Sequence, residues 1–98
     1  MSSTDKYEVK KLVAVALGKL IGREFKSRGW LERLADELDR ELKRVNSECR
    51  VKLCGVSYSV DHDDFAEMLV YCNELGPVLV RIYVDFIEYV RVLDAKIE

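Results

Sequence analysis

Residues 77–84 read PVLVRIYV, and they give the clearest signal of secondary structure in the chain. The even-numbered positions, Val78, Val80, Ile82 and Val84, are all β-branched. β-Branched side chains are restricted in a helix but pack well on one face of a pleated sheet. The stretch therefore predicts a strand whose even-numbered face lies in the core.

Residues 50–60 predict a second strand, because apolar and polar residues alternate along them. The alternation changes phase midway, since Val51 and Leu53 are odd-numbered whereas Val56 is even-numbered. One extra residue at Cys54-Gly55, in a β-bulge, would restore a continuous apolar face. We therefore expect a bulged strand here.

Residues 64–75 fit either a helix or a strand. Asp63 as N-cap, apolar residues at helical spacing and the stop signal Gly76-Pro77 favour a helix. A strand would instead place the apolar run 68–72 in a sheet, with the acidic residues 61–64 as a hairpin loop. We favour the helix.

The C-terminal segment presents the same choice. Residues 85–88 fit a capping box, and apolar residues follow at helical spacing. These apolar residues are Phe86, Val90, Leu93 and Ile97. We expect a helix over residues 86–97 in preference to a final strand.

The first half of the chain predicts two helices. Residues 5–25 carry apolar side chains at the spacing of an amphipathic helix, with enough others to predict burial on more than one face. Residues 30–45 place leucines on one side and charged residues on the other. The break at Ser27-Arg28-Gly29 predicts a short turn between two antiparallel helices.

Ala14, Gly18 and Gly22 form a stripe of small residues along the first predicted helix. Such a stripe allows another backbone to approach closely, and a glycine inside a helix is unfavourable by up to about 1 kcal/mol unless packing compensates. We expect the stripe to pack on the second helix or the sheet rather than on another copy of the chain.

Together these patterns predict an α+β fold. It consists of an N-terminal antiparallel helical hairpin, residues 5–46, packed on a small antiparallel sheet, with one or two further short helices within residues 49–98. A length of 98 residues fits a single domain, residues 1–98. Two clear strands make a thin sheet, so either the ambiguous segments are strands after all or a second copy of the chain completes the sheet. We expect a homodimer or a subunit of a larger assembly.

Composition narrows the class of protein further. The chain holds 16 Lys and Arg against 18 Asp and Glu, and no apolar run is long enough to span a membrane. The N-terminus shows no signal-peptide pattern, which predicts a cytoplasmic protein. Gln is absent, and Asn and Met are scarce, as in proteins adapted to heat.

The three cysteines, Cys49, Cys54 and Cys72, are expected to be core thiols. Their spacing, with His62, does not match a zinc site, and an odd number of cysteines in a cytoplasmic chain does not suggest a disulfide framework. Heat adaptation weakens the second argument, because intracellular proteins of hyperthermophiles do contain disulfides. The sequence leaves disulfide bonding open.

Charge is distributed unevenly along the chain. Residues 1–53 hold 13 Lys and Arg against 9 Asp and Glu, a net charge of +4, whereas residues 54–98 hold 3 against 9, a net charge of −6. Basic residues are densest around the predicted inter-helix turn, beside aromatic rings, a combination that can bind phosphate or stack a base. The candidate partner-binding or nucleic-acid-binding residues are Lys19, Arg23, Lys26, Arg28, Trp30 and Arg33.

Asp61, His62 and Asp64 offer oxygen and nitrogen ligands to a divalent cation. Their spacing matches no EF-hand, and such residues between two elements are usual in turns and helix caps. We therefore predict neither a metal nor another cofactor.

No motif for catalysis is present. The sequence contains no P-loop, no dinucleotide-binding fingerprint and no serine-nucleophile elbow. Glu37 and Glu41, with Arg40 and Arg44 nearby, predict ion pairs on a solvated helix face rather than an acid–base pair. An enzyme is not expected.

We therefore expect a small non-enzymatic module for protein–protein interaction or assembly. A nucleic-acid-associated protein that binds through the basic inter-helix region is the alternative, although a net charge of −2 is unlike a dedicated nucleic-acid binder. A metal-dependent hydrolase that uses residues 61–64 is a more remote alternative.

Overall fold

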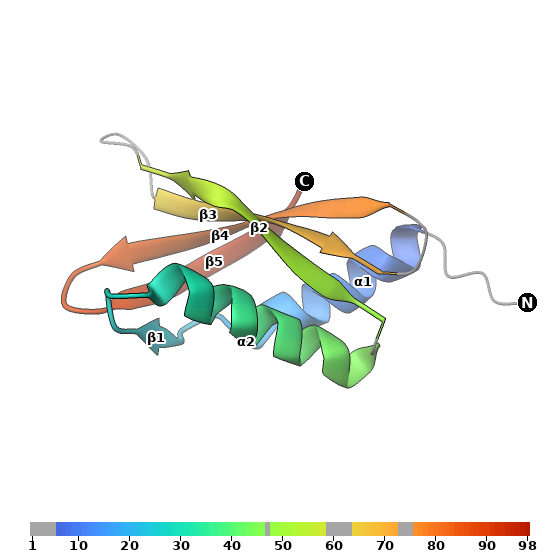
Figure 1. Ribbon diagram of the computed structural model, residues 1–98, viewed down its shortest axis with the longest axis horizontal. Helices are drawn as coiled ribbons and strands as arrows, with labels where there is room; N and C mark the ends of the chain where they lie inside the picture. The colour runs from blue at the N-terminus through green and yellow to red at the C-terminus, as the bar shows by residue number, and fades with distance from the viewer. Residues whose placement is uncertain (1–5, 47, 59–63, 73–75) are drawn as a thin grey trace, which may run out of the picture.

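The computed structural model describes residues 6–46, 48–58, 64–72 and 76–98. Within these residues, two helices and one short strand precede four longer strands (Figure 1). In chain order the elements are α1 (Lys6–Gly18), β1 (Glu24–Phe25), α2 (Trp30–Val45), β2 (Arg50–Ser57), β3 (Asp64–Tyr71), β4 (Pro77–Phe86) and β5 (Val90–Ile97).

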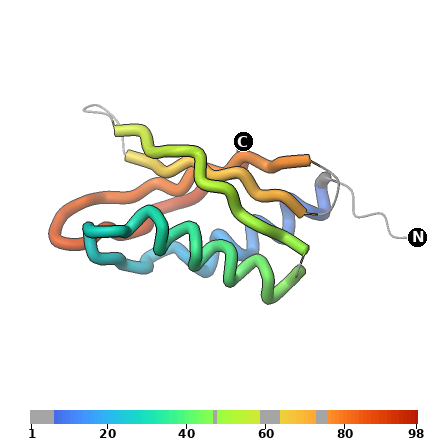
Figure 2. Tube along the Cα trace, viewed as in Figure 1, coloured from blue at the N-terminus to red at the C-terminus, as the bar shows by residue number. Residues whose placement is uncertain are grey.

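The strands form one curled antiparallel sheet. Its order is β1-β5-β4-β3-β2, so β2 to β5 form a meander in which each strand pairs with the next along the chain. β1 is added at the β5 edge by two residue pairs, Glu24 with Arg91 and Phe25 with Val90. Figures 1 and 2 show both helices on the same side of this sheet.

The two helices divide one face of the sheet between them. α1 packs beside β5 and α2 packs beside β2, at opposite ends of the meander. At the start of α2, the Trp30 ring packs edge-on against Phe86 at the end of β4, with the ring centroids 5.3 Å apart. The other face of the sheet has no described helix on it.

The core lies between the helices and the sheet. Along β4 the buried side chains are alternate residues, as the sequence of residues 77–84 predicts, and α2 adds Leu34, Leu38 and Leu42, which are fully buried. Burial of one such side chain stabilises the folded state by about 1.5–3 kcal/mol relative to exposure. The contact between α2 and the sheet therefore contributes much of the free energy of folding. The buried side chains of the longer strands are Ala66, Met68, Val70, Val78, Val80, Ile82, Val84, Val90 and Val92.

The predicted bulge in β2 is confirmed. The register of β2 with β3 shifts between Leu53 and Gly55, which leaves Cys54 as an extra, exposed residue. As a result Val51, Leu53 and Val56 all pack against the core despite their change of phase in the sequence.

The predicted fold, a helical hairpin on a small sheet with further C-terminal helices, is wrong, because the described C-terminal half consists of strands. Residues 64–75, for which we favoured a helix, contain β3. A helix there would leave β4 without its neighbour on that side, and this pairing requirement is not visible in local capping and stop signals. The predicted N-cap, Asp63, lies outside the described residues.

β5 replaces the predicted C-terminal helix, and a second bulge explains the misleading spacing. Val92 and Asp94 pair with neighbouring residues of β4, so Leu93 between them is the extra residue. The apolar side chains on the inner face therefore step by three residues across the bulge, from Val92 to Ala95, instead of by two. That step imitates helical spacing. Residues 85–88 comprise the last two residues of β4 and the start of the turn to β5, and they form no helix cap.

The N-terminal helices do not form the expected tight hairpin. α1 ends at Gly18, and β1 lies between the helices. Gly22 adopts φ 87°, and its N–H donates to the carbonyl of Val92 at 2.8 Å, so this segment joins the sheet edge. Among the described residues, no neighbouring segment comes within 4 Å of the Cβ position at Gly18 or Gly22. The expected close packing of the small-residue stripe is therefore wrong at Gly18, whereas Gly22 contacts the sheet through its backbone N–H.

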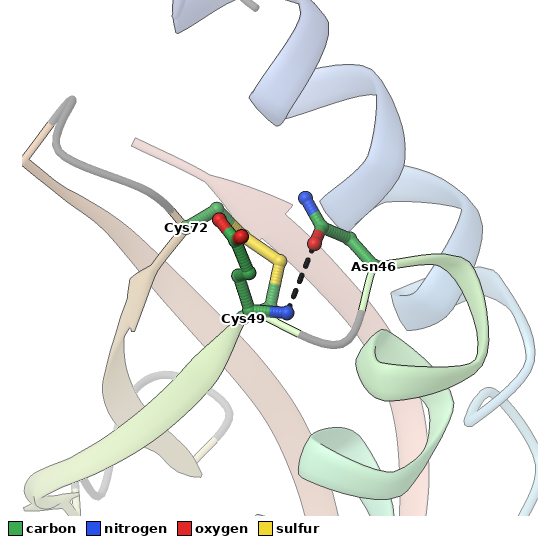
Figure 3. The surroundings of a disulfide bond; sticks show 4 residues. Asn46, Cys49 and Cys72 are labelled. Atoms are coloured by element: carbon green, nitrogen blue, oxygen red, sulfur yellow. Dashed lines mark hydrogen bonds between the residues drawn. A yellow bond between two sulfur atoms is a disulfide. The ribbon is translucent and has the colours of Figure 1, made fainter.

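Cys49 and Cys72 form a disulfide, so the expectation of core thiols is wrong for both (Figure 3). Cys49 precedes β2 and Cys72 follows β3, and both are fully buried, so the bond ties the two strands together at one end. The Asn46 side chain accepts a hydrogen bond from the Glu48 N–H (2.9 Å), and the Asn46 carbonyl accepts one from the Cys49 N–H (3.1 Å). These bonds link the end of α2 to the start of β2.

Loss of the disulfide is expected to lower the free energy of unfolding. The two cysteines are 23 residues apart in sequence, and closing a loop of this length in the unfolded chain is worth about 3 kcal/mol. The double variant Cys49→Ser/Cys72→Ser should therefore be less stable by about that amount in a urea titration followed by circular dichroism. Cys54→Ser is the control and should match the unsubstituted chain. An unchanged midpoint in the double variant would contradict the prediction.

Candidate interaction surfaces

Two of the predicted basic residues, Lys19 and Arg23, are held by carboxylates of α2. Arg23 lies just before β1, and its guanidinium donates from Nη1 to Glu37 Oε2 and from Nη2 to Glu41 Oε2, both at 2.8 Å. Lys19 Nζ lies 3.9 Å from Glu41 Oε1. These contacts tie the segment between α1 and β1 to α2.

Glu41 is 2% exposed, so the solvated helix face that we expected is wrong at this position. The predicted ion pairs are present, with Arg44 Nη1 at 3.6 Å from Glu41 Oε1 and Arg40 Nη1 at 3.5 Å from Glu37 Oε2. The hydrogen bond from Arg23 holds the pKa of the Glu41 carboxyl below its ordinary value, against the opposing effect of burial. Glu41 is therefore an ionised anchor for the cations around it, not a proton donor near neutral pH.

Trp30, another predicted binding residue, lies largely in the core. Its exposed fraction is 7%, and its ring is packed against Phe86. A buried indole cannot stack on a base without rearrangement. Trp30 is therefore a core residue and not part of an exposed binding surface.

The remaining predicted residues, Lys26, Arg28 and Arg33, are exposed. Lys26 and Arg28 lie on the connection from β1 to α2, and Arg33 lies near the start of α2. Figure 1 shows this connection beside the β4–β5 turn, at one end of the molecule. Large apolar side chains are exposed at the same end, and the rings of Tyr58 and Phe86 are 6.0 Å apart. We call this the hairpin-end surface, which consists of Lys26, Arg28, Arg33, Tyr58, Phe86, Ile87 and Tyr89.

The aromatic part of the hairpin-end surface was missed in the sequence. Ile87 is 86% exposed, Tyr58 66% and Tyr89 49%. Residues 86–89 were assigned to a helix, where Phe86 would have faced the core. A strand assignment for residues 77–84 and 90–97 would have placed a turn between them and revealed apolar side chains at its tip.

A pocket of about 210 Å³ opens beside the β4–β5 turn. Arg91 Nη2 reaches Glu24 Oε2 at 3.1 Å across the β1–β5 pair. The pocket is lined by Glu24, Asp85, Ile87, Glu88, Tyr89 and Arg91. Its carboxylates do not form an ion-binding cluster, since no group of three or more potential metal ligands converges within the described residues.

A second surface lies between α1 and the outer edge of β5. A groove of about 250 Å³ separates the helix from the strand there, and the Gly18 and Ala14 positions leave it open. Ile21, one of the lining residues, is 47% exposed, and two residues close in sequence to the lining, Val15 and Leu93, are 55% and 38% exposed. We call it the α1–β5 groove, and it is lined by Ala14, Leu17, Gly18, Ile21, Ala95 and Ile97.

The candidate metal ligands are not brought together by what the structure describes. Asp61 and His62 lie outside the described residues, and Asp64 begins β3. Of the cysteines that we considered for zinc, Cys49 and Cys72 are bonded to each other, and Cys54 is free and exposed on β2.

Comparison with known proteins gives no family: no family model, curated protein or solved structure matches the chain. In the described part of the chain, no helix has the length and hydropathy needed to cross a membrane. The chemistry of the two surfaces is therefore the basis for a functional proposal.

The Arg23–Glu41 contact predicts a specific pH dependence of stability. Because folding lowers the pKa of Glu41 below its ordinary value of 4.5, its contribution is present above that value and is lost as the pH falls through the lowered pKa. Glu41→Gln should be less stable than the unsubstituted chain at neutral pH, and the difference should narrow in acid. Urea titrations at neutral pH and at about pH 3 measure this change.

Glu32→Gln is the matched control, because Glu32 is exposed on the same helix. It should leave stability nearly unchanged at both pH values. A Glu41→Gln variant whose stability deficit stays constant across the pH range would show that the ion pairs of Glu41 do not contribute in the way described.

Proposed function

We propose that this chain is a non-enzymatic assembly module that associates with protein through apolar surface, and first of all with a second copy of itself. The observation that carries the proposal is the α1–β5 groove, an apolar groove beside a sheet edge. Ile21, which lines the groove, is exposed, and Val15 of α1 and Leu93 of β5 are exposed on the two elements that form it. Apolar surface of this kind is stabilised when a partner removes it from water.

The sheet edge adds a second reason for association. Along β5, β1 pairs with Val90 and Arg91, and the preceding segment bonds to Val92, but the described residues supply no strand beside the rest of β5. An exposed edge presents unpaired N–H and C=O groups that another strand can bind. Groove and edge together favour a partner that brings both a strand and an apolar side chain.

A nucleic-acid-associated function is the second candidate, favoured by the hairpin-end surface. Lys26, Arg28 and Arg33 are exposed at the same end of the molecule as the rings of Tyr58 and Phe86, and a surface that combines cations with aromatic rings suits single-stranded nucleic acid. The basic charge of residues 1–53 is not neutralised by ion pairs with the acidic residues 54–98. Within the described residues one ion pair joins the two halves, Arg91–Glu24, and in it the acidic residue belongs to residues 1–53.

For location, we infer the cytoplasm of a heat-adapted cell. Structural disulfides are rare in the cytosol of mesophiles but are used in hyperthermophiles, so the Cys49–Cys72 bond agrees with the scarcity of Gln, Asn and Met. The same bond would also suit an oxidising compartment, and localisation of the tagged chain in its own cell separates these two.

Light scattering coupled to gel filtration tests the assembly proposal. We expect a dimer whose mass is unchanged between low and high salt, because apolar contacts and backbone hydrogen bonds are weakly screened. Addition of a mixed pool of short RNA and DNA should leave the mass unchanged. A monomer at all accessible concentrations would sink the self-association part of the proposal.

A mass that rises with nucleic acid at low salt only would favour the second candidate, because phosphate contacts weaken steeply with salt. In that case Lys26→Glu/Arg28→Glu should abolish the rise. Lys10→Glu/Lys11→Glu, which makes the same charge change at exposed positions of α1, should retain it. Equal loss in both variants would point to net charge rather than to the hairpin-end surface.

A further inference from the structure

The free part of the β5 edge is short and defined. Gly22 N–H donates to Val92 O, and Val92 N–H donates to Arg23 O, so pairing on this edge reaches Val92. Beyond it, Leu93 to Ile97 have no strand beside them in the described part of the chain. The edge therefore offers five residues, directly below the α1–β5 groove.

The hydrogen bonds between β5 and β4 determine which backbone groups of β5 point away from β4, toward the open edge. Glu98 N–H donates to Leu79 O on β4 at 2.9 Å. Because hydrogen-bonding groups alternate between the two sides of an antiparallel strand, Ile97 and Ala95 point theirs outward. Ala95 N–H agrees with this direction, since it donates to the Asp94 carboxylate (2.8 Å) and not to a neighbouring strand. In a strand pair centred on Ala95, the carbonyl of the partner's Ala95 would replace the Asp94 carboxylate as its acceptor.

The side chains along this edge carry charges of both signs. Asp94 and Lys96 pair with Tyr83 and Arg81 of β4, which places both on the face of the sheet without helices. Within the described residues, neither Asp94 nor Lys96 forms an ion pair. Lys96 instead lies over the Tyr83 ring, 5.4 Å from its centroid.

These charges select one register for two copies of β5. In a two-fold antiparallel pair centred on Ala95, Asp94 of each chain lies opposite Lys96 of the other, twice over. The same register sets Leu93 opposite Ile97 and uses all five free residues. A shift of the axis to Asp94 or to Lys96 would instead place like charges directly opposite each other.

The opposite edge of the sheet shows the contrary pattern. On β2, Arg50 and Lys52 share the face without helices, because they pair with Tyr71 and Leu69 of β3. Antiparallel pairing of two β2 strands would set these cations against each other, and the bulge at Cys54 interrupts the ladder. Self-pairing is therefore disfavoured at β2 and favoured at β5.

Pairing through β5 also gives the small residues of α1 a role. A two-fold axis perpendicular to the sheet places the two α1 helices on the same side, each beside its own β5. Ala14 and Gly18 line the groove on that side, so the helices can approach closely and cover the exposed Ile21 and Val15.

We propose that two copies of this chain associate through residues 93–97 of β5 in an antiparallel register centred on Ala95, which joins two five-stranded sheets into one. This inference rests on the proposed function and adds to it the strand, the register and the paired residues. Each interface ion pair is Asp94 of one chain with Lys96 of its partner.

Charge substitution at these two positions tests the pairing. Lys96→Glu places a second carboxylate opposite Asp94 at both symmetric sites, so the dimer dissociation constant should rise at least about tenfold. Asp94→Lys should weaken the dimer similarly. The double variant Asp94→Lys/Lys96→Glu restores opposite charges and should return to near the original constant, measured by sedimentation equilibrium.

Mixing gives a sharper form of the same test. Asp94→Lys and Lys96→Glu are each self-repelling, but they complement one another in this register, so an equimolar mixture should form a heterodimer. Lys52→Glu on β2 is the control and should leave the dissociation constant unchanged. Equal weakening by Lys52→Glu, or no rescue in the double variant, would overturn the assignment to β5.

A disulfide test fixes the register independently of charge. In a Cys54→Ser background, Ala95→Cys places two thiols on the two-fold axis with Cα atoms about 5.5 Å apart, within disulfide range. Asp94→Cys is the matched control, because its two copies would be about 8 Å apart. Oxidation by oxygen with a copper catalyst should link the Ala95→Cys chains rapidly and the Asp94→Cys chains slowly.

The outcomes separate the two proposals. Faster linkage through Asp94→Cys overturns the register. A dimer that ignores every β5 substitution overturns the interface but leaves the assembly module standing. A chain that stays monomeric overturns the β5 interface and the self-association part of the assembly proposal.

Discussion

The structure depends on covering one apolar face of a four-stranded meander. β2 to β5 each present alternate apolar residues to the same side, and an uncovered face of this size would aggregate rather than fold. α2 meets the requirement with Leu34, Leu38 and Leu42 above the β2 side, and α1 covers the β5 side. The bulges keep the face continuous, because each returns the following residues of its strand to the inner side.

Polar contacts hold the covering elements in place rather than forming a reactive centre. The disulfide closes one end of the β2–β3 pair beside the end of α2, and Glu41 gathers Arg23, Lys19 and Arg44 near the segment before β1. The disulfide and the Glu41 carboxylate are both buried, and each connects segments that are distant in sequence. Removing one charge of a buried pair leaves the other without compensation, which explains why such residues are structural anchors.

Sequence reasoning succeeded where the signal was local. The limits of α2, the strand at residues 77–84 and the β2 bulge follow from short-range periodicity. Prediction failed where pairing with other strands decides the structure, since residues 64–71 form a strand between β2 and β4. The predicted basic site divided in the same way: Lys26, Arg28 and Arg33 are exposed, whereas Arg23 and Trp30 are engaged by partners that no local pattern reveals.

The bulge at Leu93 accounts both for the helical spacing of residues 86–97 and for the open part of the β5 edge. It gives β5 a three-residue step that resembles a helix, and it lies directly after Val92, where pairing with the β1 segment ends. β1 covers the edge before the bulge, and the five residues from Leu93 onward are left for a partner. Natural sheets usually blunt an open edge with charge of one sign, as β2 does with Arg50 and Lys52. On β5 the charges alternate in sign, which disfavours a shift of the two-fold axis to Asp94 or Lys96 and favours the register centred on Ala95.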